Sequence, residues 1–148
     1  MTEILFYHLE QRPLEEVLPL LLEKTLERGW KAVVEVADEG ALQGLDAALW
    51  TYRDESFLPH GIAEGDQAAD LPIAITMAQD NPNQAQLRFF AKGAVPRDEE
   101  GYDRLVYLFD GHNPDAVTTA RQVWKSLKDK HDLTYWQQEP NGKWVKKA

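Results

Sequence analysis

The chain has 148 residues, of which 43% are hydrophobic and 28% charged, and a net charge of −9. It is long enough for one folded domain over residues 1–148, and too acidic for broad contact with nucleic acid phosphates. It has no cysteine, which excludes disulfides and thiolate-ligated zinc or iron–sulfur sites. The N-terminus lacks the basic start of a signal peptide, and its apolar runs are too short to span a bilayer. We therefore expect a cytoplasmic protein that does not contact membranes.

Strand and helix patterns alternate along the chain. Apolar, often β-branched runs predict strands at 4–7, 32–36, 71–77, 87–91 and 105–109. Helical spacing predicts helices at 14–26, 39–51 and 114–130, with Asp38 and Asn113 as N-caps and Gly29 as a stop. Pro19 either kinks the first helix or marks its N1 position. Two final strands, 134–138 and 143–147, flank an Asn141-Gly142 turn.

This order predicts an α/β fold with three layers: a largely parallel central sheet, helices on both faces and a C-terminal β-hairpin. Residues 62–70 and 92–104 are the expected mobile loops. The fold would be Rossmann-like, but the segment after the first strand, residues 8–13, contains no glycine. A backbone without glycine there cannot approach a pyrophosphate in the usual way, so we expect no nucleotide site and no cofactor.

The histidines allow a catalytic alternative. His60 follows two acidic residues, and Asp110 and His112 follow the fifth predicted strand, where α/β enzymes often keep catalytic groups. A small hydrolase or transferase could use these three residues. They could equally well form turns, and no two histidines have the spacing of a metal-ligand pair. We expect no catalytic and no metal site.

The last predicted helix has two distinct stripes. At 100° per residue, Ala116, Ala120, Val123 and Leu127 form the stripe that should face the sheet. The neighbouring stripe brings together an apolar residue, a tryptophan and cations: Val117, Arg121, Trp124 and Lys128, with Lys125 at its border. This second stripe is either a solvated basic face or a pocket for a peptide that ends in an apolar side chain and a carboxylate.

Two aromatic residues, Trp50 and Phe57, bracket a charged turn. Large rings next to a polar loop need a surface that covers them. That surface is either this protein's own core, with Trp50 on the apolar face of its helix, or a partner protein.

Several motifs together resemble the chi subunit family of bacterial DNA polymerase III, over essentially the whole chain. The motifs are Phe6-Tyr7, the segment from Leu45 to Trp50, the run Glu55-Ser56-Phe57-Leu58-Pro59-His60, and Ala120-Arg121 with Trp124-Lys125. The resemblance implies a non-catalytic accessory subunit in the clamp-loader assembly, a monomer on its own that meets DNA only indirectly. Val117 and Trp124 stand where one member of the family has a lysine and a tyrosine, and residues 79–104 differ from that member in length and composition.

The resemblance also implies two partner sites. Family members bind the acidic C-terminal tail of single-stranded-DNA-binding protein, which ends in Pro-Phe, and they bind the psi subunit or a helicase. By motif, the tail site corresponds to Val117, Arg121, Trp124, Lys125 and Lys128, and the psi or helicase interface to Trp50 and Phe57.

Overall fold

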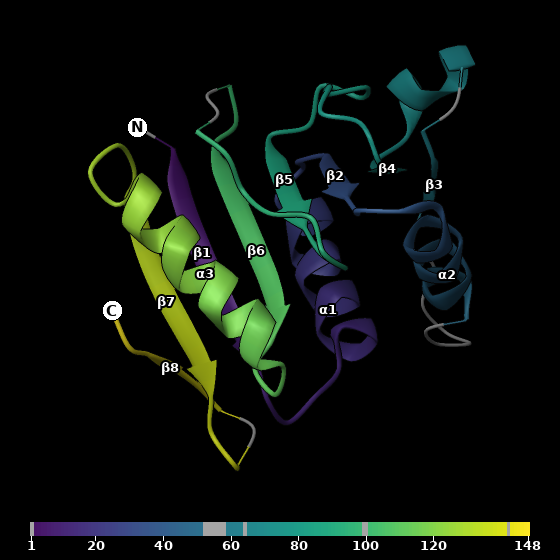
Figure 1. The fold of residues 1–148 in the computed structure, drawn as a ribbon. Helices are drawn as coiled ribbons and strands as arrows, with labels where there is room; N and C mark the ends of the chain where they lie inside the picture. The colour runs from purple at the N-terminus through teal and green to yellow at the C-terminus, as the bar shows by residue number, and fades with distance from the viewer. Residues whose placement is uncertain (1, 52–58, 64, 99–100, 142) are drawn as a thin grey trace.

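The computed structural model describes residues 2–51, 59–63, 65–98, 101–141 and 143–148. Their strands are β1 (Glu3–Leu9), β2 (Ala32–Glu35), β3 (His60–Ile62), β4 (Ile73–Thr76), β5 (Leu87–Phe90), β6 (Arg104–Asp110), β7 (Asp132–Gln138) and β8 (Trp144–Lys146). These strands form one sheet in the order β3-β4-β2-β5-β6-β1-β7-β8 (Figure 1). Neighbouring strands are parallel except for the antiparallel pair β7–β8. The predicted largely parallel sheet and C-terminal hairpin are confirmed.

The helices cover both faces of the sheet, which confirms the three-layer prediction (Figure 1). Helices α1 (Leu14–Glu27) and α2 (Glu39–Trp50) share one apolar core with side chains from β1, β2, β4, β5 and β6. Helix α3 (Pro114–Leu127) packs on the other face over β1 and β6. The predicted core stripe of α3 is confirmed, because Ala120 and Leu127 are buried and Ala116 and Val123 pack against that core.

Local signals set the helix ends where the sequence suggested. The Asp38 carboxylate accepts a hydrogen bond from the Ala41 N–H at 2.8 Å, and the Asn113 side chain accepts from the Asp115 N–H at 3.0 Å. Gly29 has a φ of 78°, the left-handed geometry that follows a helix C-terminus. Pro19 lies inside α1, so the prediction of Pro19 at N1 is wrong.

Other boundaries also differ from the predictions. The expected strand at 71–77 is shorter in the structure, where β4 covers only Ile73–Thr76. The last helix ends at Leu127 rather than at 130, where the chain turns into β7. The expected loop at 62–70 instead contains the end of β3 and the 3₁₀-helix η1 (Gly65–Asp70). The sequence did not predict β3, because three residues are too few to show the alternating pattern of a strand.

A buried ion cluster holds the segment after β5 against the sheet. Arg88, on β5, is fully buried, and its guanidinium donates to Glu35 at 2.5 Å and to the carbonyl oxygens of Ala78 and Asp80. Arg97 donates to the same carboxylate at 2.7 and 2.9 Å. Burial by itself would raise the pKa of Glu35, but the hydrogen bonds from Arg97 and Arg88 lower the pKa below its usual value. Glu35 is therefore ionised and fixes residues 91–98 over the sheet.

Replacing Glu35 should destabilise the fold strongly. The change Glu35→Gln leaves the guanidinium of Arg88 buried without its counter-charge, which costs about 3–5 kcal/mol when one partner of a buried pair is removed. Urea unfolding followed by circular dichroism measures this loss.

Glu15→Gln is the matched control, because Glu15 pairs with Lys92 at the surface. Exposed ion pairs contribute up to about 1 kcal/mol. Equal losses in the two variants would contradict the role assigned to the buried cluster.

Candidate functional site

The second stripe of α3 forms a surface beside β7, which we call the α3 basic surface and define as Val117, Arg121, Trp124, Lys125 and Lys128. Trp124 is half-buried, and its ring lies edge-on at 5.2 Å from Phe6 and 6.0 Å from Tyr135, centroid to centroid. Val117 packs against the same core. The three cations of the stripe are exposed. The structure thus brings all five predicted residues to one helix face, where the Trp124 ring packs on Phe6 and Tyr135.

The charges of this surface have no counter-charge among the described residues. Arg121, Lys125 and Lys128 form no ion pair there, whereas the neighbouring Lys130 pairs with Asp98 at 3.4 Å. Arg121 lies close enough to Tyr135 and His8 for its charge to act on both of them. Unpaired cations beside a half-buried ring can hold a carboxylate next to an apolar side chain.

Beneath Arg121 lies a polar pair that the sequence analysis did not single out. The Tyr135 hydroxyl and His8 Nδ1 are hydrogen-bonded at 2.6 Å. Burial raises the pKa of Tyr135, against the opposing charge of Arg121. Burial also lowers the pKa of His8, although Glu10 at 3.0 Å opposes this shift. Both groups are therefore neutral near pH 7, and Arg121 faces no negative charge from them. Only the pairing of β1 with β7 brings these residues together, and local sequence gives no signal of that pairing.

Trp50, at the end of α2, is 55% exposed. The alternative that Trp50 completes the core of this protein is therefore wrong, and the alternative of a covering partner stays a prediction. The ring still contacts His60, with centroids 4.5 Å apart, and His60 Nε2 lies 3.3 Å from the Asp46 carboxylate. Phe57 lies outside the residues that the structure describes.

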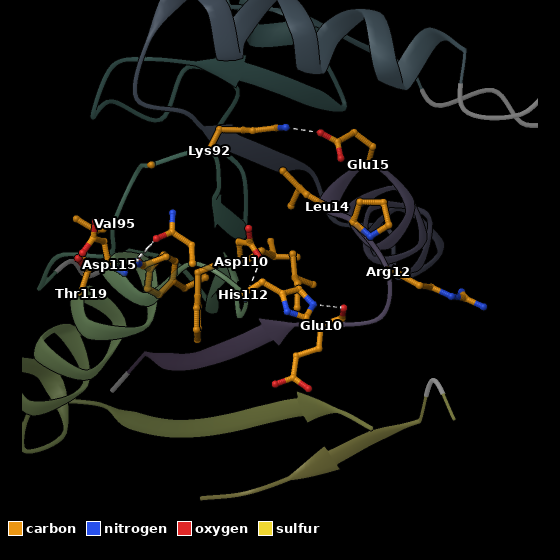
Figure 2. Close-up of a pocket in the computed structure, with 18 of the residues that line it drawn as sticks. Glu10, Arg12, Leu14, Glu15, Lys92, Val95, Asp110, His112, Asp115 and Thr119 are labelled. Atoms are coloured by element: carbon orange, nitrogen blue, oxygen red, sulfur yellow. Dashed lines mark hydrogen bonds and ion pairs between the residues drawn. The ribbon is translucent and has the colours of Figure 1, made fainter. Parts of the chain in front are cut away.

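A crevice opens at the carboxyl ends of β1 and β6, with a volume of about 740 Å³ (Figure 2). After β1 the chain crosses β6 and β5 to reach β2, and after β6 it crosses β1 to reach β7. The connections leave in opposite directions, which marks the place where α/β enzymes bind their ligands. Its charged lining is mixed, with acids at Glu10, Glu15, Asp110 and Asp115 against Arg12 and Lys92. Four carboxylates oppose a phosphate group at this place.

Two of the candidate catalytic residues form turn contacts in this crevice. The Asp110 carboxylate accepts the backbone N–H of His112 at 2.9 Å, and His112 Nε2 lies 2.6 Å from the carbonyl oxygen of Glu10. These contacts shape the turn that leads to the Asn113 cap. The alternative that Asp110 and His112 form a turn agrees with these contacts. His112 itself is exposed.

His60 does not join Asp110 and His112. It is the first residue of β3, whereas Asp110 is the last residue of β6, four strands away in the sheet. Four strand spacings amount to about 19 Å. The three residues of the alternative catalytic site therefore cannot act on one substrate. Within the described ranges, the structure contains no group of three or more potential metal-ligating side chains and no helix long and apolar enough to cross a membrane.

A family model and two known proteins that resemble this chain carry the same family name. Residues 1–134 match the family described as "DNA polymerase III chi subunit, HolC". DNA polymerase III subunit chi of Pseudomonas aeruginosa is 36% identical over 67 residues, which cover 45% of this chain and 46% of that protein. The probable DNA polymerase III subunit chi of Rickettsia prowazekii is 32% identical over 87 residues, 59% of this chain and 53% of that protein. The matched segments thus span about half the length of these two relatives.

Proposed function

Because the chain belongs to the DNA polymerase III chi subunit family, we propose that it is a non-catalytic accessory subunit of the bacterial replicase. In this role it acts in the clamp-loader assembly. One surface binds the acidic C-terminal tail of single-stranded-DNA-binding protein, and a second surface binds the psi subunit or a helicase. The protein thereby links a DNA-coating protein to the replication machinery and contacts DNA only indirectly.

One observation supports the tail site above all others. On a chain of net charge −9, the α3 basic surface places a half-buried Trp124 next to Arg121, Lys125 and Lys128, which have no acidic partner in the described part of the chain. An acidic tail is attracted to these cations in spite of the net charge, because local fields govern encounter.

The physical steps of tail binding follow from this arrangement. The terminal phenylalanine packs against Trp124 and Val117, and burial of such a side chain contributes roughly 2 kcal/mol. The terminal carboxylate accepts hydrogen bonds from Arg121 or Lys125. One tail binds modestly and in a salt-sensitive way, and several tails on one DNA-bound oligomer give a strong link through avidity.

The second surface rests on Trp50. A large ring that is 55% exposed at a helix end is a typical contact residue of a protein interface. We assign the psi or helicase interface to Trp50 together with Phe57, which follows it in the sequence.

Arg121→Ala should weaken binding of an acidic peptide that ends in Pro-Phe at least tenfold. Loss of a charged hydrogen-bond donor costs about 1.5–3 kcal/mol, and the exposed position of Arg121 leaves the fold unchanged. Isothermal titration calorimetry at fixed salt measures the dissociation constant.

Lys130→Ala is the control, since it removes a cation from the same part of the chain but lies off the α3 basic surface and pairs with Asp98. Equal affinity of the wild type and Arg121→Ala would refute the pocket.

Trp50→Ala should leave the melting temperature nearly unchanged but abolish capture of the psi subunit or helicase from a lysate of the source organism. The exposed ring contributes little to the stability of the core. Truncation of an interface tryptophan often costs about 2 kcal/mol or more of binding free energy. Affinity purification followed by mass spectrometry reads out the captured proteins.

Met77→Ala, which changes another exposed hydrophobic residue (45% exposed), is the matched control and should capture the same proteins as the wild type. Undiminished capture of these partners by Trp50→Ala would exclude Trp50 from the interface.

A further inference from the structure

A groove lies between α1 and the β7–β8 hairpin, on the face of the sheet opposite to α3. Its volume is about 420 Å³, and we call it the α1–hairpin groove. It is lined by Tyr7, Arg12, Val17, Leu20, Leu21, Lys24, Trp136, Gln138 and Trp144. Helix α1 packs over β2 and β6, and the hairpin extends the sheet at the other side of β1 (Figure 1). The groove forms because the helix layer ends before the sheet does.

The floor of the groove is apolar and aromatic. Tyr7 and Trp136 are neighbours in the β1–β7 register, and Trp144 pairs with Gln138 across the hairpin. The Tyr7 and Trp144 rings meet edge to face, 5.1 Å apart at 88°. These three rings are half-buried, as are Leu20 and Leu21 on the helix wall. Such a floor can cover a bulky apolar side chain.

The rim of the groove is basic. Among the described lining residues the charged ones are Arg12 and Lys24, both exposed and without an ion pair to another described residue. A smaller hollow of about 130 Å³ shares Tyr7, Leu21 and Lys24 and adds Arg28 and Arg104. The charged residues that line the two hollows are thus all cations in the described part of a chain with 25 acidic and 16 basic residues.

The two cations of the smaller hollow have contacts of their own. Arg28 lies over the Trp30 ring at 5.1 Å from its centroid, a contact that leaves its charge in place. Arg104 Nη2 is 3.7 Å from the Glu3 carboxylate, and Arg104 Nε is buried without a hydrogen-bond partner among the described residues. The unpaired charges of the groove itself are therefore those of Arg12 and Lys24, beside an apolar floor.

We propose that the α1–hairpin groove binds an acidic peptide segment of a partner protein, at a site separate from the α3 basic surface. One bulky apolar side chain of the segment packs between Leu21, Trp136 and Trp144. Its carboxylates accept hydrogen bonds from Arg12 and Lys24 at the rim. The segment needs no free C-terminus, because Arg12 precedes the first turn of α1 and Lys24 lies in its last turn, so the two cations do not gather at one end.

The geometry favours a peptide over single-stranded nucleic acid. Bases bind by stacking on exposed ring faces, whereas Tyr7 and Trp144 meet edge to face and half of the apolar lining residues of the groove are aliphatic.

The test uses the 148-residue chain and amidated twelve-residue peptides of Asp and Glu with one central Phe, Leu or Trp. Amidation removes the terminal carboxylate that the α3 basic surface is proposed to hold. Fluorescence anisotropy of the labelled peptides gives the affinities, and circular dichroism confirms that each variant folds. At least one peptide should bind, and the double variant Arg12→Glu/Lys24→Glu should weaken it at least tenfold.

Two comparisons separate this site from the proposed tail site. Arg121→Ala should leave the affinity for the amidated peptide unchanged, and Arg12→Glu/Lys24→Glu should leave the affinity for a Pro-Phe-ending peptide within about twofold, since it acts only through the long-range field. No binding of any of the three peptides at millimolar concentration would overturn the proposal. Equal binding by the double variant, or tighter binding of oligo(dT) through Arg12 and Lys24, would overturn it as well.

Discussion

The direction of two crossover connections decides where each surface of this protein lies. Parallel crossovers are almost always right-handed, so connections that leave in opposite directions place their helices on opposite faces of the sheet. The chain leaves β1 toward β2 and leaves β6 toward β7. Helices α1 and α2 accordingly share one core, and α3 packs on the other. The crevice between β1 and β6, the isolated α3 and the uncovered face of the hairpin all follow from this one constraint.

The aromatic packing under α3 fixes the ring of the proposed tail site. Phe6 is fully buried on β1 and contacts both Trp124 and Tyr135. Trp124 is thereby held with one side against the core and the other toward solvent, so little side-chain entropy remains to be lost when a ligand packs on it. The neutral pair of His8 and Tyr135 below Arg121 adds no competing negative charge. The ring of Trp124 is therefore fixed beside exposed cations before the proposed tail binds.

Local sequence was sufficient for part of this account. The caps at Asp38 and Asn113, the core stripe of α3 and the hairpin are encoded by residues a few positions apart, and each was predicted. The strand order was out of reach, because the pairing of β1 with both β6 and β7 joins residues about 100 and 130 positions apart. Arg88 was missed for a related reason, since an arginine in a strand is normally exposed and only Glu35 and Arg97 make its burial stable. The contact of His8 with Tyr135 likewise depends on strand order.

We propose that one sheet presents two partner surfaces that are occupied at the same time. Figure 1 shows α2 and α3 over different parts of the sheet and on opposite faces, so neither partner should obstruct the other. The direct measurement is native mass spectrometry of the protein mixed with the Pro-Phe-ending tail peptide and the psi subunit or helicase of the source organism. The account predicts a ternary complex with one copy of each component, and an unchanged dissociation constant for the peptide when the larger partner is saturating. Two binary complexes that exclude each other, with the peptide displaced as the partner is added, would contradict it.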